Sequence, residues 1–148
     1  MPLIESPEAM HELGVALSRK LQAGDLVILA GPLGAGKTAL TQGIGAGLGI
    51  TGITSPTFVI SKVYPGRLPL IHVDAYRLLD SATQGFEFDD LDLDTAREAA
   101  VTVIEWGSDV ALRLGEDYLK IELSFGDLET QRRVELVSHG DRWRNFKL

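Results

Sequence analysis

The spacing of apolar residues predicts a helix near the start of the chain. From Met10 to Leu21, apolar residues recur every three or four positions, which gives a helix one apolar face. The preceding Ser6-Pro7-Glu8 is typical of a helix start, because serine caps the first turn and proline fits the first helical position. Gly24 is predicted to end this helix.

Short apolar runs and alternating segments predict the strands of a sheet. Strands are predicted at residues 26–30, 58–64, 70–74 and 101–105. Residues 118–125 and 133–138 alternate apolar and polar positions, which predicts an antiparallel pair that closes the edge of the sheet. A second helix is predicted from about residue 39 to Leu48. Strands interspersed with helices in this way indicate an α/β protein.

Length, composition and charge narrow the class of protein. A chain of 148 residues, 45% hydrophobic and 24% charged, is expected to form one globular domain over residues 1–148. The absence of cysteine excludes disulfides. No signal peptide or membrane-spanning run is visible in the sequence, so we expect a cytoplasmic protein. The net charge of −7 argues against a broad nucleic-acid-binding face, so a role in nucleic-acid metabolism would act through a protein partner.

The residues that join the first predicted strand to the second helix fit a phosphate-binding loop. Gly31 to Thr38 reads Gly-Pro-Leu-Gly-Ala-Gly-Lys-Thr, which matches G-x-x-x-x-G-K-[ST] between a strand and a helix. The glycines allow backbone amides to point at phosphate oxygens, and the helix adds the positive end of its dipole. Lys37 is the candidate ligand of the β- and γ-phosphates, and the Thr38 hydroxyl is the candidate ligand of Mg²⁺. The alternative is a glycine-rich turn with an exposed lysine. The predicted nucleotide-binding residues of the loop are Leu33, Gly34, Ala35, Gly36, Lys37 and Thr38.

Two further predicted strands end in a carboxylate, Asp74 and Glu105. The carboxyl ends of parallel strands meet at one edge, so both acids are expected in the Mg²⁺–phosphate region. The pattern leaves open which acid binds the metal and which orients an attacking water, and for Asp74 a turn cap is the alternative. His72 is interpreted as structural. Trp106 is interpreted as a packing residue that can also line the site.

Three other features could contact a ligand, a partner or the body of the domain. Arg132 and Arg133 could stack on a nucleotide base or pair with an acid, and a solvated pair is the simpler reading. The acidic run 86–94 is either a solvated loop or a surface that faces a partner. The tail from Asp141 onward carries Trp143, which could dock on the body of the domain.

Together these motifs resemble the TsaE family, also called YjeE, of small bacterial ATPases. The resemblance runs from about Ser6 to Val137. It rests on the loop, on Ser55-Pro56-Thr57-Phe58, on His72-Val73-Asp74-Ala75-Tyr76-Arg77-Leu78, and on Glu105-Trp106. One departure is visible, because Gln84-Gly85-Phe86-Glu87-Phe88 stands where the family often has a Glu-Leu-Glu-Phe-rich sequence.

The resemblance implies a P-loop NTPase-like domain with a mixed, mostly parallel sheet flanked by helices. It implies that ATP and Mg²⁺ bind at the loop, with Thr38 and Glu105 at the metal. Thr57 resembles a switch-like threonine near the γ-phosphate, Asp74 the acid of the His-x-Asp motif, and Trp106 a site residue. The family acts with TsaD and TsaB, and its ATP hydrolysis supports threonylcarbamoyladenosine modification of tRNA without making the threonylcarbamoyl bond.

Three other functions compete with this one. A small-molecule P-loop kinase is the first, although such enzymes usually place arginines in a mobile lid and few arginines occur here. A GTPase is the second, and the lone asparagine, Asn145, speaks against the Asn-Lys-x-Asp motif common in that class. A non-hydrolysing interaction module is the third, and the acids at Asp74 and Glu105 argue against it.

Overall fold

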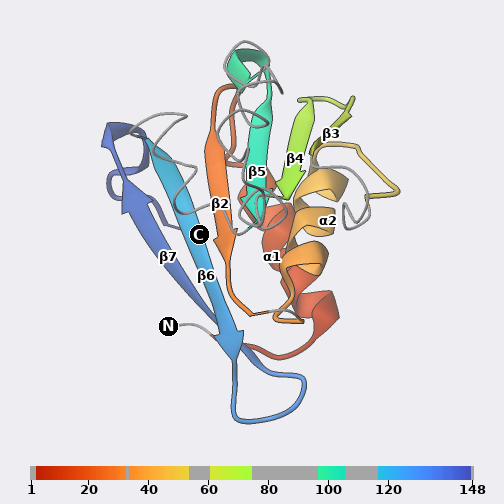
Figure 1. Cartoon of the computed structure of the whole chain (residues 1–148), viewed down its shortest axis with the longest axis vertical. Helices are drawn as coiled ribbons and strands as arrows, with labels where there is room; N and C mark the ends of the chain where they lie inside the picture. The colour runs from red at the N-terminus through yellow and green to blue at the C-terminus, as the bar shows by residue number, and fades with distance from the viewer. Residues whose placement is uncertain (1–2, 33, 54–60, 75–96, 106–116, 148) are drawn as a thin grey trace, which may run out of the picture.

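A seven-stranded sheet forms the centre of the computed structural model, which describes residues 3–32, 34–53, 61–74, 97–105 and 117–147 (Figure 1). Its strands are β1 (Leu3–Ile4), β2 (Leu26–Ala30), β3 (Ser61–Tyr64), β4 (Leu70–Asp74), β5 (Val101–Glu105), β6 (Tyr118–Phe125) and β7 (Arg132–His139). Its helices are α1 (Pro7–Ser18) and α2 (Lys37–Gly47), with two short 3₁₀ turns, η1 (Arg97–Ala99) and η2 (Asp141–Trp143). The predicted bounds of β2, β4, β5 and β6 are confirmed.

The strand order is β1-β7-β6-β2-β5-β4-β3, and the central strands β6, β2, β5 and β4 are parallel. The sheet is therefore mixed, as expected, with antiparallel strands at both sides. The C-terminal pair β6–β7 is antiparallel, which is confirmed, but it does not close the sheet. The two-residue strand β1 pairs outside β7, and a strand of two residues is too short to show any period in the sequence.

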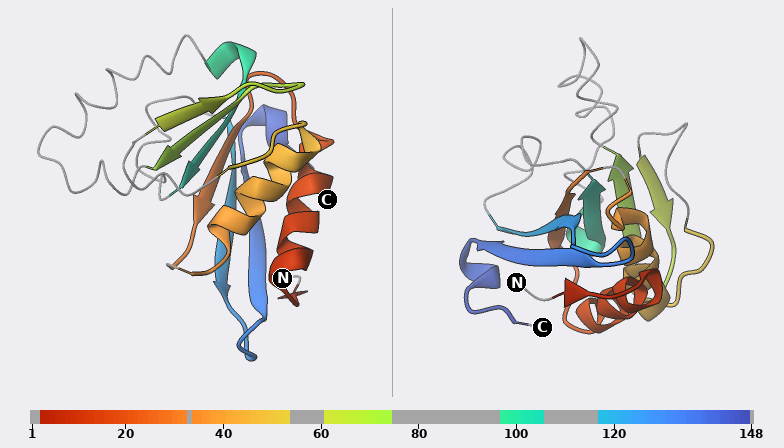
Figure 2. Two further views of the ribbon diagram at one scale, coloured as in Figure 1. Left: turned by 90° about the vertical axis from the view of Figure 1, so that its right-hand side faces the viewer. Right: turned by 90° about the horizontal axis from the view of Figure 1, so that it is seen from below.

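Both helices cover one face of the sheet and pack closely against each other (Figure 2). Glycines make this close approach possible. A Cβ on Gly14 would collide with the carbonyl oxygen of Leu40, and one on Gly43 would collide with that of His11. The helix that follows the phosphate-binding loop is thus held firmly against the N-terminal helix. Within the described residues, neither helix has the length and apolar character needed to cross a membrane.

Helix α1 begins as predicted and ends earlier than predicted. Ser6 is the N-cap, and its hydroxyl oxygen accepts a hydrogen bond of 3.1 Å from the amide of Ala9. The helix ends at Ser18, so Gly24 does not terminate it. Gly24 instead forms the turn into β2, with φ of 91° and its amide donating to the carbonyl of Ala100 at 2.9 Å. A positive φ suits a glycine in a turn as well as at a helix end, so the sequence signal was ambiguous.

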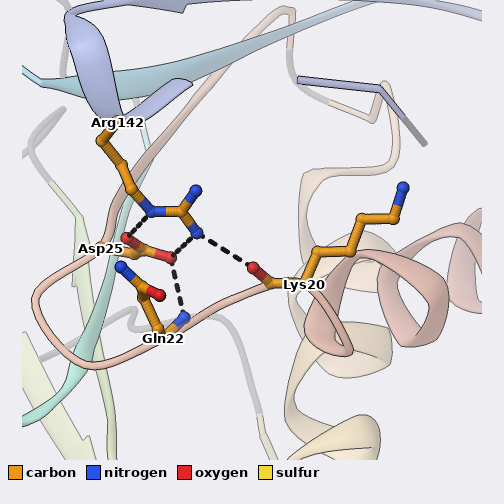
Figure 3. Close-up of polar contacts among 4 residues, drawn as sticks. All are labelled: Lys20, Gln22, Asp25 and Arg142. Carbon is orange, nitrogen blue, oxygen red and sulfur yellow. Dashed lines mark hydrogen bonds and ion pairs between the residues drawn. The ribbon is translucent and has the colours of Figure 1, made fainter. Parts of the chain in front are cut away.

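The C-terminal tail docks on the body, as the sequence suggested. The Trp143 side chain is fully buried and meets Phe146 edge to face at 5.0 Å. Next to it, the Arg142 guanidinium donates two hydrogen bonds of 2.9 Å to the buried carboxylate of Asp25 (Figure 3). The same guanidinium donates to the carbonyl of Lys20 at 3.0 Å. The tail therefore fixes the turn that leads from α1 into β2.

We predict that Arg142→Ala lowers the free energy of unfolding by about 2 kcal/mol, because it removes the guanidinium from a carboxylate that is 3% exposed. Arg144→Ala is the matched control, since its ion pair with Asp141 is exposed and is expected to contribute less than about 0.5 kcal/mol. Urea denaturation of both variants measures the difference. Equal losses in the two variants would contradict the structural role of the Asp25–Arg142 pair.

Candidate phosphate-binding site

The predicted loop leaves the carboxyl end of β2 and leads into the first turn of α2 (Figure 1). Gly31, its first residue, has φ of 147°, and a Cβ there would collide with the carbonyl oxygen of Leu123 in β6. Gly36, the N-cap of α2, has φ of 109°. Side chains are disfavoured in both conformations, so the glycines of the motif are required by the backbone path of the loop.

The N-terminus of α2 is built differently from that of α1. Helix α1 has a serine cap and Glu8 in its first turn. Within the described residues, α2 has no side-chain cap and no acidic residue in its first turn. The positive end of its dipole therefore has no anionic or capping side chain of its own, which is the arrangement that binds a phosphate group.

Lys37 is the first residue of α2 and is 5% exposed. Its ammonium group turns back over the loop and donates hydrogen bonds to the carbonyl oxygens of Gly31 at 2.7 Å and Pro32 at 2.9 Å. This burial argues against the alternative of an exposed lysine in a glycine-rich turn. The contacts fix a positive charge within the loop, beside the N-terminus of α2.

The strand register brings the two predicted acids to the edge where the loop begins. Glu105 pairs with Leu29, two residues before Gly31, and also with Asp74 on the other side. Asp74 and Glu105 are the last residues of β4 and β5. The expectation that both strands end at one edge beside the loop is confirmed for their backbones.

Glu105 is 5% exposed, and its Oε2 lies 2.6 Å from Nε2 of the fully buried His72. Sequence reasoning missed this contact, because it treated His72 alone. The sequence does contain a signal for it. His72 lies two residues before position 74, so it shares a face of the sheet with that position and with Glu105, which pairs with position 74 on the neighbouring strand.

The donors near the loop fit a small divalent cation. Thr38 is half-buried in the first turn of α2 and offers a hydroxyl oxygen, and Glu105 offers a carboxylate whose Oε2 contacts His72. Mg²⁺ prefers such oxygen ligands, few in number and completed by water and phosphate. The described residues contain no group of three or more His, Asp or Glu that could hold a metal alone.

A cavity of about 280 Å³ lies beside the loop. It opens between the start of α1, the loop and the turn that joins β6 to β7. Its lining residues are Ser6, Pro7, Met10, Gly34, Gly36, Ala39, Glu129, Thr130 and Arg132. Its position next to the N-terminus of α2 and its partly apolar wall suit a planar heterocycle attached to a phosphate chain.

The structure separates the two predicted arginines. Arg132 lines the cavity, where its guanidinium lies 4.9 Å from the Phe125 ring centroid and donates to the carbonyl of Gly34 at 3.3 Å. Arg133 points to Asp127 at 3.4 Å, and the Asp127 side chain of that pair is largely exposed. Arg132 thus remains a candidate for contact with a base, while Arg133 forms the exposed acid pair that was its alternative.

Several predicted features lie outside the described residues. These are Leu33, Thr57, Trp106 and the acidic run 86–94. For Asp74 the structure gives the backbone position.

The glycine-shaped loop, the buried lysine and the helix N-terminus without a side-chain cap define a P-loop protein of the NTPase-like α/β class. The model of the family described as "Threonylcarbamoyl adenosine biosynthesis protein TsaE" matches residues 4–134. The chain therefore belongs to the TsaE family, and the resemblance inferred from the motifs is confirmed.

Individual relatives agree with this assignment. The tRNA threonylcarbamoyladenosine biosynthesis protein TsaE of Streptomyces coelicolor is 48% identical over 141 residues, which cover 90% of this chain and 93% of the relative. The protein of the same name from Mycobacterium tuberculosis H37Rv is 47% identical over 136 residues, which cover 87% of this chain and 74% of the relative. The crystal structure of YdiB from Bacillus subtilis superposes with a TM-score of 0.76 at 29% identity, and covers 97% of this chain and 88% of that chain.

Proposed function

We propose that residues 1–148 form a single ATP-binding and ATP-hydrolysing domain that supports threonylcarbamoyladenosine modification of tRNA together with TsaD and TsaB. The observation that carries the ATP-binding part is the buried ammonium of Lys37, held by two loop carbonyls at the start of a helix without a side-chain cap. The role in tRNA modification is supported by family membership and by the names of the relatives. The net charge of −7 supports action on tRNA through partner proteins.

In this proposal the triphosphate binds to the loop residues from Leu33 to Thr38. Backbone amides and the dipole of α2 stabilise its negative charge, and Lys37 contacts the β- and γ-phosphates. Thr38 and Glu105 hold Mg²⁺, which neutralises part of the phosphate charge. The base occupies the cavity beside the loop, where the guanidinium of Arg132 stacks on it.

Hydrolysis proceeds by direct attack of water on the γ-phosphate. The new P–O bond forms as the bond to the β–γ bridging oxygen breaks, which releases ADP and inorganic phosphate without a phospho-enzyme. Asp74 stands in register with Glu105, and in this proposal one of the two acids orients the water. Thr57 and Trp106 complete the proposed catalytic set, on the resemblance of their motifs to those of the family.

The proposed function is tested by measuring ATP turnover by the purified protein, alone and with TsaD and TsaB. We expect weak activity alone that changes when both partners are added, with inorganic phosphate as the product. Activity that ignores the partners and transfers phosphate to a metabolite would instead support the small-molecule P-loop kinase. Tight GTP binding without ATP binding would contradict ATP as the ligand.

We predict that Lys37→Ala weakens binding of Mg²⁺-ATP about 100-fold or more, because it removes a charged donor to the phosphates from a buried position. Lys120→Ala is the control, since this lysine pairs with Glu122 on β6 at 3.0 Å. Isothermal titration calorimetry compares the two variants with the unmodified protein. ATP affinity unchanged in Lys37→Ala would rule out the loop as the phosphate site.

We also predict that Arg132→Ala weakens ATP binding about tenfold through loss of a stacking contact in the cavity, with little effect on binding of inorganic triphosphate. Arg133→Ala is the matched control, because Arg133 lies in an exposed pair with Asp127. Parallel titrations with ATP and with inorganic triphosphate separate the base contact from the phosphate contact. The assignment of the base to this cavity fails if the two arginine variants behave alike.

A further inference from the structure

His72 is a polar residue buried in the interior of the sheet. It is the third residue of β4, is fully buried, and lies two positions before Asp74. In the register of β4 and β5 it stands beside Val103, and its ring reaches along the strand to Oε2 of Glu105 at 2.6 Å. The imidazole therefore contacts the acid at the end of the neighbouring strand.

Packing alone does not account for a histidine at this position. Neighbouring residues on the two strands, including Leu70, Val101 and Val103, belong to the apolar core. Within the described part of the chain, Nδ1 of His72 is buried without a hydrogen-bond partner, which is unfavourable in an apolar environment. Replacing a buried polar pair by apolar residues of similar volume is often neutral or stabilising. The buried imidazole thus has a cost in stability, and among the described residues its ring nitrogen Nε2 contacts Glu105.

We propose that His72 is a positioning residue for Glu105, an inference that rests on the proposed function. When Glu105 is ionised, as binding of a cation requires, Nε2 of His72 donates a hydrogen bond to Oε2. This contact restricts rotation of the carboxylate, whose other oxygen, Oε1, would then bind the cation. Partners of this kind orient the residues that bind a metal, and their removal typically weakens metal affinity 10- to 100-fold.

The test measures how binding of the non-hydrolysable analogue AMP-PNP depends on Mg²⁺. Mg²⁺ is expected to increase the affinity for AMP-PNP. For His72→Leu we expect the Mg²⁺ concentration that gives half of this increase to rise about 10- to 100-fold. The AMP-PNP affinity measured in EDTA is expected to stay unchanged. His72→Gln can place an amide donor near the position of Nε2 and is expected to restore most of the Mg²⁺ response. His139→Leu is the control, since His139 stacks on Tyr118 at 4.6 Å at the far end of β7.

A structural role for His72 makes a different prediction. In that case His72→Leu would change the AMP-PNP affinity by the same factor with and without Mg²⁺, or would leave both affinities unchanged. Either result would overturn the proposal. If AMP-PNP binding by the unmodified protein did not depend on Mg²⁺ at all, the proposed function itself would be overturned, and this inference with it. Glu105→Gln is the reference variant, because it removes the charge that His72 is proposed to orient.

A second measurement avoids variants that fail to fold. In the unmodified protein labelled with ¹⁵N-histidine, the Nε2 signal of His72 is expected to shift when Mg²⁺ is added to the AMP-PNP complex. The signals of His11 and His139, the other two histidines among the three in the chain, are expected to stay in place. An unchanged His72 signal would overturn the proposal.

Discussion

The hydrogen bonds from Lys37 to the carbonyls of Gly31 and Pro32 are the contacts on which the proposed site depends. They hold the ammonium group of Lys37 inside the loop, at the start of α2. The backbone path of this loop leaves no room for a side chain at Gly31. The helix is itself fixed by its close contact with α1, which glycines permit. Phosphate binding, in this account, uses charges and dipoles that the fold has already positioned.

The parallel strands add the remaining chemistry to the same edge. The register of β2, β5 and β4 brings Glu105 and Asp74 level with the end of β2, where the loop begins. His72, on the neighbouring strand β4, contacts Glu105 and lies further from the loop than Glu105 does. On the other side, the turn between β6 and β7 brings Arg132 against the loop and completes the wall of the cavity.

Much of this fold could be predicted from the sequence, since β2, β4, β5 and β6 are continuous apolar or regularly alternating runs with clear ends. The loop, Lys37 and the acids at the strand ends were predictable because their chemistry depends on local spacing. The predicted end of α1 was wrong, because a glycine with positive φ is as common in a turn as at a helix end. The His72–Glu105 contact, the cavity and the difference between Arg132 and Arg133 depend on strand register and on distant residues, which local patterns do not encode.

A crystal structure of the protein with AMP-PNP and Mg²⁺ would show whether the loop binds the triphosphate. We expect the triphosphate on the loop amides with Lys37 at the β- and γ-phosphates, the cation between Thr38 and Glu105, and the base beside Arg132. A nucleotide bound elsewhere, or a loop in which Lys37 keeps its carbonyl contacts and touches no phosphate, would contradict it.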